Sequence, residues 1–400
     1  MANNKRVELF SHLSRITTPG RKFIPQIDGL RFVAILSVIA YHVWQIGLFH
    51  LAKAAPAEVI SGGLVVRVFS TGHFGVELFF TVSGFILALP FARQILSGGE
   101  RVPLRDYYWR RLTRIEPPYV IALLIAFLLC ALVFRRLTNH AQVYGNAGWL
   151  HYSLAHIGAS LAYVNAFVFG AHPYPNNVLW SLEVEVQFYL LAPWLVKIFF
   201  VRKAWWRRLL IAGTAVLFPY LAGWIGGANY WAWSSLLGNL QYFLAGFLLA
   251  DFYLAGWLAT ARKFKWDAVF LLAGAATVFI QGHTAWLFLM PWLILAACVS
   301  AFRGRIIARL LGNRWLTTIG GMCYTIYLYH WFMISMLYRG TIGLQTKILW
   351  LDLLIQFAVM TPVIIVVCTG LFVLFERPFM RRDWPQKLWG KIRRPKHCRL

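Results

Sequence analysis

The sequence is poor in charged residues, and above all in acidic ones. Only 13% of its 400 residues are charged, and Lys and Arg outnumber Asp and Glu by 39 to 14. Soluble domains carry about 25% charged residues, so this composition argues against a soluble globular protein. Hydrophobic residues make up 60% of the chain, which indicates a membrane protein with several spans.

Cysteine is also scarce, and none of the 5 cysteines has C-x-x-C spacing. Neither a disulfide framework nor a metal site is therefore indicated, and we expect no metal. The sequence also lacks an internal repeat and a low-complexity linker, which predicts one integral domain. Residues 1–24 are polar, so we expect no cleavable secretory signal and an uncleaved first span.

Long apolar runs, in contrast, are abundant. A span needs about 17 to 25 residues to cross a hydrocarbon core about 30 Å thick. Ten stretches fit: 27–47, 73–92, 117–134, 178–199, 209–227, 235–255, 267–281, 284–301, 315–338 and 347–374. The sequence therefore predicts an all-α polytopic membrane protein, a bundle of about ten transmembrane helices. The short seventh and eighth runs could be two full spans, a tight hairpin or re-entrant halves.

The basic residues are distributed unevenly about these spans. Six of the 39 fall in loops on one side, Arg31 lies inside the first span, and the other 32 lie on the opposite side. By the positive-inside rule both termini are cytoplasmic. Because the charges flank spans, nucleic acid is not an expected partner. The predicted parts are a cytoplasmic tail (1–24), a transmembrane domain (25–376) and a basic cytoplasmic tail (377–400).

The first span contains three ionisable residues, Asp28, Arg31 and His42. Arg31 and His42 are eleven residues apart, so on a helix they differ by about 20° in direction and about 16 Å in height. A charged side chain at mid-membrane costs at least about 2.5 kcal/mol and usually marks a functional site. Asp28 lies at the cytoplasmic edge, where it need not be buried and could pair with Arg31 or Arg21.

The second span adds an intramembrane carboxylate, Glu77, and a hydroxyl, Ser83. A buried carboxylate without a partner would become protonated, so we expect Arg31 or His42 to lie near Glu77.

The loop 93–116 is the most basic internal segment of the chain. Arg111 and Arg114 are three residues apart, on one helix face just inside the membrane. Guanidinium groups bind phosphate oxygens in a bidentate manner, so this loop is suited to a phosphorylated cytosolic ligand.

Two later spans carry lines of polar side chains. In the fourth, Ser181, Glu185 and Tyr189 recur every four residues beside Trp180; in the ninth, Tyr324, Tyr327 and His330 recur every three. Tyrosines alone would suggest an interfacial belt and His330 alone a core residue, but the two lines together favour a polar site between helices.

Taken together, these stretches resemble the acyltransferase-3 family of integral membrane acyltransferases, whose members mostly O-acylate sugars. The resemblance covers about 25–380. It is carried by Arg31 and His42, "GVELFFTVSGF" (75–85), "RLTRIEP" (111–117), "WSLEVEVQFYL" (180–190), "CYTIYLYH" (323–330) and "ERP" (376–378). The family glutamate falls on Glu185 rather than Glu183, and Cys323 stands where the family usually has serine.

The resemblance implies an acyl-CoA donor, typically acetyl-CoA, and an alcohol acceptor on a cell-envelope or exported glycan at the bacterial inner membrane. Its implied roles fit the residues. We expect His42 to be a general base or covalent acyl carrier, Asp28 or Glu77 to orient it, and Arg31 to hold the donor or the oxyanion, with Glu185 also catalytic. Arg105, Arg110, Arg111 and Arg114 would hold the CoA phosphates. The substrate-binding or structural polar residues would be Ser83, Trp180, Ser181, Tyr189, Tyr324, Tyr327 and His330.

Several alternatives stay open at this stage. The acceptor could instead be a glycosylated or macrolide-type metabolite, and neither the acyl length nor assembly as a homo-oligomer is fixed. A secondary transporter or a lipid-linked sugar flippase would also need charges facing a cavity. Neither an inverted repeat nor paired broken helices is found, and transport leaves the arginine-rich loop unexplained.

Overall fold

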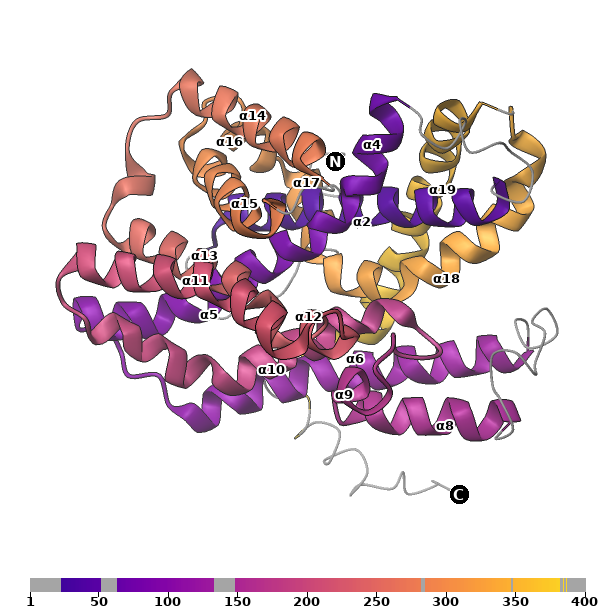
Figure 1. Ribbon diagram of the computed structural model, residues 1–400, viewed down its shortest axis with the longest axis horizontal. Helices are drawn as coiled ribbons and strands as arrows, with labels where there is room; N and C mark the ends of the chain where they lie inside the picture. The colour runs from indigo at the N-terminus through magenta and orange to yellow at the C-terminus, as the bar shows by residue number, and fades with distance from the viewer. Residues whose placement is uncertain are drawn as a thin grey trace, which may run out of the picture.

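The computed structural model describes residues 23–51, 63–132, 148–281, 285–346 and 348–381, together with 384 and 386. Within these residues every regular element is a helix (Figure 1). The longer helices are α2 Pro25–Leu51, α5 Phe74–Ser97, α6 Leu104–Leu132, α8 Gly148–Leu161, α10 Trp180–Leu195, α11 Ala204–Gly226, α13 Leu236–Leu254, α14 Phe264–Ile280, α15 Trp286–Arg303, α18 Cys323–Thr341 and α19 Leu349–Leu371.

Short helices join or extend these elements. They are α4 Leu64–Ser70, α9 Asn165–Phe169, α12 Tyr230–Trp233, α16 Ile307–Leu311 and α17 Arg314–Gly321. Helix α4 continues into α5 through a single 3₁₀ turn. After α19 the chain forms a π-helical turn, Phe372–Glu376.

Six helices among the described residues are long and apolar enough to cross a membrane. They cover Pro25–Leu48, Leu64–Ser97, Leu104–Leu132, Ala204–Gly226, Trp286–Arg303 and Leu349–Met380. The other four predicted spans are also helical, but α10 and α14 are only 16 and 17 residues long, and α13 and α18 include polar residues that lower their hydropathy. The total of ten spans and the cytoplasmic position of both ends therefore stay predictions.

The seventh and eighth apolar runs form two separate helices, α14 and α15, which pack side by side (Figure 1). Of the two, α15 is among the helices long and apolar enough to cross a membrane, and the presence of two full spans here stays a prediction.

The centre of the bundle is formed by α2, α5 and α13, which approach one another at glycines. A Cβ atom on Gly84 of α5 would overlap the carbonyl oxygen of Phe243, and one on Gly246 of α13 would overlap that of Thr81. Small residues permit this backbone contact, because helix association in lipid depends on close packing. Nearly all of α13 is buried as a result.

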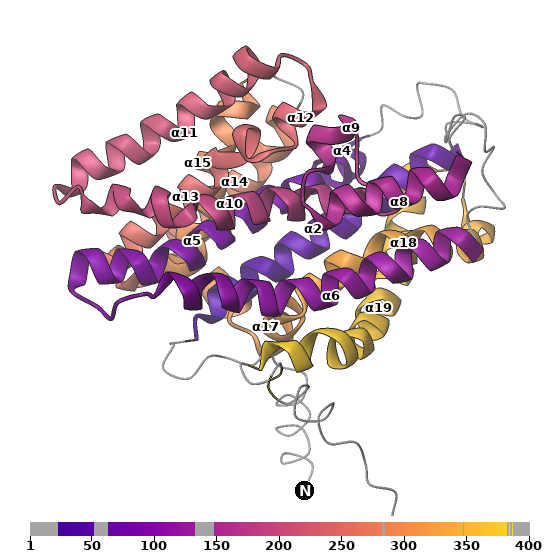
Figure 2. The ribbon, with the colours of Figure 1, turned by 90° about the horizontal axis from the view of Figure 1, so that it is seen from below.

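Helix α8 lies along α6 (Figure 2) and is not one of the six span candidates. Two consecutive prolines interrupt the hydrogen bonding of α6 near its middle. Because Pro117 has no N–H, the carbonyl of Thr113 loses its helical partner. The indole Nε1 of Trp384 donates to that oxygen at 3.1 Å, so the C-terminal segment stabilises α6 at this point.

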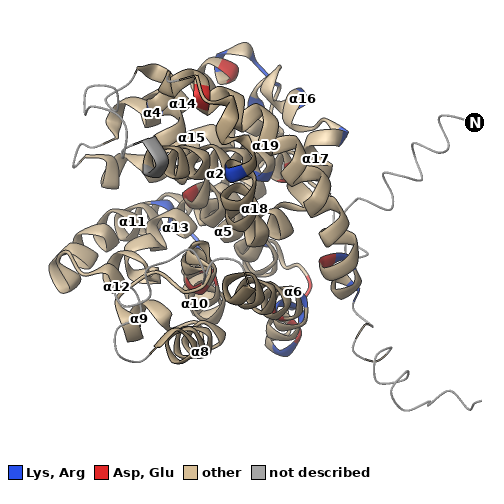
Figure 3. Ribbon diagram, turned by 90° about the vertical axis from the view of Figure 1, so that its right-hand side faces the viewer, with Lys and Arg blue, Asp and Glu red and all other residues tan. Residues whose placement is uncertain are grey.

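Most of the ribbon is coloured as residues other than Lys, Arg, Asp and Glu (Figure 3). One buried carboxylate is paired with two arginines: Asp251 at the end of α13 accepts hydrogen bonds from Arg207 at 2.5 Å and Arg208 at 2.7 Å. This ion pair joins α11 to α13. The pairing follows from the high cost of an isolated charge in a low-dielectric interior.

We predict that Gly84→Ala lowers the melting temperature of the purified protein, because the added methyl overlaps backbone that cannot move without separating α5 from α13. The control is Gly213→Ala on α11, where a Cβ meets nothing within 4 Å and alanine favours a helix by about 1 kcal/mol. Scanning fluorimetry in detergent measures both. A Gly84→Ala protein as stable as the control would contradict the packing argument.

Candidate active site

Arg31 and Asp28 form an ion pair in the first turns of α2, with Nη1 and Oδ1 2.7 Å apart. Asp28 is only 2% exposed, so the expectation that it need not be buried was wrong. The reason is α17, whose Gly320 contacts the backbone of Asp28 so closely that a Cβ would not fit. Arg21, the other expected partner, lies outside the described residues.

A carboxylate from α10 also interacts with Arg31. Glu185 interacts electrostatically with Arg31 and accepts a hydrogen bond from the Ser83 hydroxyl at 2.6 Å. Tyr189, one turn further along α10, interacts electrostatically with Glu185. We call Asp28, Arg31, Ser83, Glu185 and Tyr189 the Arg31 cluster. It joins α2, α5 and α10 through polar residues that the sequence singles out separately.

The structure separates the two glutamates of α10. Glu183 is fully buried and points to α9, where its Oε2 accepts from the backbone N–H of Ala166 at 3.4 Å. Glu185 belongs to the Arg31 cluster. The two residues are two positions apart and so face different sides of the helix, which agrees with the choice of Glu185 from the sequence motif.

The second polar group centres on two histidines from different helices. The rings of His42 on α2 and His330 on α18 have centroids 5.0 Å apart. Nδ1 of His42 donates to the Gln45 side-chain oxygen at 3.0 Å, and Nδ1 of His330 donates to the carbonyls of Tyr327 at 2.8 Å and Ile326 at 3.2 Å. We call His42 and His330 the histidine pair.

Polar residues of α10 and α18 support the histidine pair. The Tyr327 hydroxyl donates to the carbonyl of Val178 at 2.7 Å, so its oxygen accepts from Ser181 at 2.5 Å. Trp180 packs by its ring edge on Phe80 of α5, with centroids 6.4 Å apart. These contacts attach α18 to the beginning of α10 next to His330.

No carboxylate hydrogen-bonds to His42 within the described residues; its partner is Gln45. Oε1 of Glu77 instead lies 3.9 Å from Nδ1 of His73, in the 3₁₀ turn before α5, and its Oε2 atom is buried with no hydrogen-bond partner within the described residues. Gln45, three residues after His42, was not singled out from the sequence. The i, i+3 spacing is the signal that points to it, but an amide on an apolar helix is weak evidence alone.

The arginines at the start of α6 differ in how far they are engaged. Arg110 pairs with Asp106 at 3.4 Å, and Arg111 stacks on the Tyr107 ring at 3.8 Å. Arg105 is exposed, and neither Arg105 nor Arg114 makes a hydrogen bond or ion pair within the described segments. Arg111 also lies 6.0 Å from the ring of Tyr189. We call the start of α6 that carries Arg105, Arg110, Arg111 and Arg114 the basic turn of α6. It therefore adjoins the Arg31 cluster.

Two further contacts fix the start of α18, the helix that carries His330. The Tyr324 hydroxyl donates to the carbonyl of Ile115 on α6 at 3.0 Å. Glu376, from the π-helical turn after α19, accepts from the backbone N–H of Thr325 at 3.1 Å and from its hydroxyl at 2.5 Å. The sequence motif contained Glu376 but did not indicate this contact, because its partner lies 51 positions earlier.

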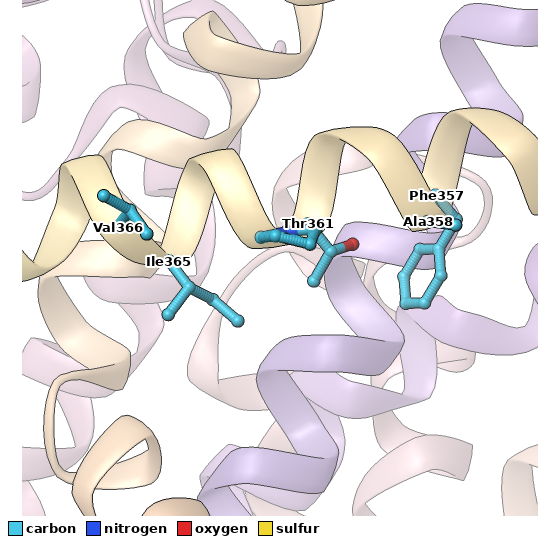
Figure 4. A pocket seen from close by; sticks show the side chains of 6 residues that line it. Phe357, Ala358, Thr361, Ile365 and Val366 are labelled. Atoms are coloured by element: carbon cyan, nitrogen blue, oxygen red, sulfur yellow. The ribbon is translucent and has the colours of Figure 1, made fainter.

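An open apolar hollow elsewhere in the molecule provides no comparable chemistry. It runs along α19 and is lined by Phe357, Ala358, Thr361, Pro362, Ile365 and Val366 (Figure 4). It has no group for acid–base chemistry, so we place the candidate site by its ionisable side chains. The described part of the chain holds no group of three or more His, Cys, Asp or Glu side chains arranged to bind a metal.

The fold and the two polar clusters define a membrane protein with a buried site suited to acid–base and anion chemistry. Comparison with known families gives a match to the acyltransferase domain over residues 24–394. The chain belongs to the acyltransferase-3 family, which confirms the resemblance found in the sequence. No solved structure is found to match it.

Three relatives illustrate the range of similarity. The peptidoglycan O-acetyltransferase OatA of Listeria monocytogenes is 27% identical over 188 residues, covering 47% of this chain and 26% of its own length. The O-acetyltransferase OatA of Staphylococcus aureus is 27% identical over 191 residues, covering 46% and 26%. A Staphylococcus aureus protein provisionally named an O-acetyltransferase is 24% identical over 413 aligned positions, covering 95% and 61%. The chain thus spans less than two thirds of each relative.

The division between the two glutamates gives a testable contrast. Glu185→Gln removes the charge beside Arg31, and we expect acyl transfer in washed membranes to fall at least about tenfold, equivalent to about 1.4 kcal/mol. Glu183→Gln keeps an oxygen that can accept from Ala166, so we expect its rate to stay near that of the wild type. Equal losses in both variants, with unchanged melting temperatures, would refute the distinction.

Proposed function

We propose that this protein transfers an acyl group, most simply acetyl, from cytosolic acyl-CoA to a hydroxyl of a cell-envelope glycan. The observation that carries the proposal is the arrangement on α2. Arg31 and His42 share one helix face, and each belongs to a separate polar cluster completed by other helices. The basic turn of α6 adjoins one of these clusters. Membership of the acyltransferase-3 family supports this reading.

The basic turn of α6 is suited to bind the donor. CoA carries a pyrophosphate and a 3′-phosphate, and guanidinium groups bind such anions with paired hydrogen bonds. Arg114 and Arg105 are the available groups, because within the described residues neither is paired with a carboxylate. Arg111 is held by its stacking on Tyr107 and so is already ordered before a ligand binds. An ordered guanidinium loses less conformational entropy on binding.

The histidine pair is suited to the chemical step. Since Nδ1 of His42 donates to Gln45, its Nε2 atom carries the lone pair in the neutral ring. That atom can remove a proton from the acceptor hydroxyl or attack the thioester carbonyl itself. Arg31, balanced by Asp28 and Glu185, can hold the donor or stabilise negative charge on the thioester oxygen.

The separation of the two clusters is consistent with transfer across part of the membrane. Eleven residues of α2 place His42 about 16 Å beyond Arg31, which is about half of a hydrocarbon core about 30 Å thick. We propose that the donor enters on the cytoplasmic side, at the basic turn of α6, and that the acceptor approaches from the other side.

The names of the relatives favour a glycan acceptor. One is a peptidoglycan O-acetyltransferase and another an O-acetyltransferase, although each is matched over about half of this chain. We therefore propose a cell-wall glycan as acceptor at the bacterial inner membrane. Mass spectrometry of wall fragments from cells with and without the gene tests this directly: a lost acetyl increment on a sugar is expected, whereas a change confined to small metabolites would favour the metabolite alternative.

We predict that His42→Ala abolishes acyl transfer while the protein still inserts into the membrane. The loss should be about 10²-fold or more, the usual contribution of a general acid or base. The measurement is CoA release from acetyl-CoA by equal amounts of purified protein, with the melting temperature as the folding control. Residual activity equal to the wild type would rule out His42 as the reacting group.

We further predict that Arg114→Ala raises the concentration of acetyl-CoA needed for half-maximal rate several-fold and leaves the maximal rate nearly unchanged, because a phosphate contact is lost. Arg262→Ala is the matched control: it removes the same charge from an exposed position beyond α13. If both variants show the same shift, the effect is general electrostatics and not a phosphate site.

A further inference from the structure

One nitrogen of the histidine pair, Nε2 of His330, makes no hydrogen bond within the described residues. Both acceptors at Nδ1 of His330 are backbone carbonyls, Tyr327 and Ile326. A carbonyl only accepts, so Nδ1 must carry the ring hydrogen, and in the neutral ring Nε2 is an acceptor. His330 is completely buried, and within the described residues its Nε2 has no hydrogen-bond partner.

A structural role does not account for this arrangement. Burying a polar atom without a partner destabilises the fold, and a histidine that only filled space could be replaced by an apolar side chain. His330 instead faces a second imidazole, with ring centroids 5.0 Å apart. Tyr327, one turn before it, is fixed by Val178 and Ser181, so its carbonyl holds the His330 ring in one orientation.

A His42 that carries the acyl group cannot also act as the base for the acceptor. If its Nε2 attacks the thioester, that nitrogen bears the acyl group, and its Nδ1 already carries a hydrogen donated to Gln45. At that moment the ring has no lone pair for the proton of the acceptor hydroxyl. A second base would accelerate this step, and an imidazole in ring contact with His42 is that of His330.

Resting on the function proposed above, we propose that the two histidines divide the reaction, with His42 carrying the acyl group and His330 acting as the base for the acceptor. Nε2 of His42 attacks the thioester carbon, the C–S bond breaks and CoA leaves as the thiolate. The acceptor oxygen then attacks the acyl carbon while its proton passes to Nε2 of His330.

The second attack breaks the C–N bond, and its electron pair returns to His42. The proton on His330 passes through solvent to the CoA thiolate. The sum is a thioester and an alcohol giving an ester and a thiol, with both imidazoles restored to their neutral form.

The test uses purified full-length protein and radiolabelled acetyl-CoA with no acceptor except water. Two quantities are followed: label on the protein after a rapid quench, and free acetate. We expect the wild type to become labelled and then to release acetate. His42→Gln should never be labelled, whereas His330→Gln should be labelled normally but lose its label about 10²- to 10⁴-fold more slowly, the range for one general base.

The matched control is His156→Gln. His156 is also buried and also bonded through Nδ1, to Asn165 at 2.8 Å, but it lies on α8, outside the histidine pair. We expect it to behave as the wild type in both measurements. Labelling of His330→Gln itself shows that the variant is folded, and added imidazole should speed the loss of label in His330→Ala.

The possible results separate this inference from the proposed function. A wild type that releases CoA and acetate without ever being labelled would show direct transfer and overturn the division of roles, while leaving acyl transfer intact. Loss of label from His330→Gln at the wild-type rate would also overturn it, as would absence of labelling in both His330→Gln and His330→Asn at unchanged melting temperature. A wild type that neither releases CoA from acetyl-CoA nor acylates wall glycan would overturn the proposed function instead.

Discussion

The constraint that shapes this molecule is the cost of placing an ionisable group in a medium that cannot solvate it. Arg31 lies inside an apolar helix, so the fold surrounds it with Asp28 from its own helix and Glu185 from α10. Each partner requires a further element: α17 covers Asp28, and Ser83 of α5 orients Glu185. The surroundings of a single guanidinium thus involve residues of four helices, α2, α5, α10 and α17.

Close packing provides the frame in which these pairs can form. Hydrogen bonds and ion pairs act over about 3 Å, so helices that present them must be held at fixed distances. The backbone contact of α5 with α13 at Gly84 and Gly246 supplies that precision next to Ser83. Polar residues then link the remaining helices to this frame, as Glu183 does for α9 and Glu376 for α18.

Much of this arrangement could be predicted from the sequence, because it depends on the regular helix. The spacing of Arg31 and His42 fixes their shared face, and each of the ten apolar runs contains a helix. What could not be predicted depends on tertiary contacts: the burial of Asp28 under α17, the pairing of Glu77 with His73 rather than His42, and the approach of His330 to His42. A sequence specifies that such residues face the interior, but the crossing of α2 and α18 decides which of them meet.

The same geometry explains why the two clusters are kept apart. The phosphates of a CoA donor cannot follow its acyl group into the membrane, since each charge would need its own partner there. Under the proposed function they stay at the basic turn of α6, and the uncharged arm of the donor bridges the distance to His42. Arg31 lies between these two points with its charge already balanced, so a passing thioester meets a preorganised cation rather than one that must first be desolvated. Under the proposed function, the distance between Arg31 and His42 along α2 would thus suit the length of the CoA donor.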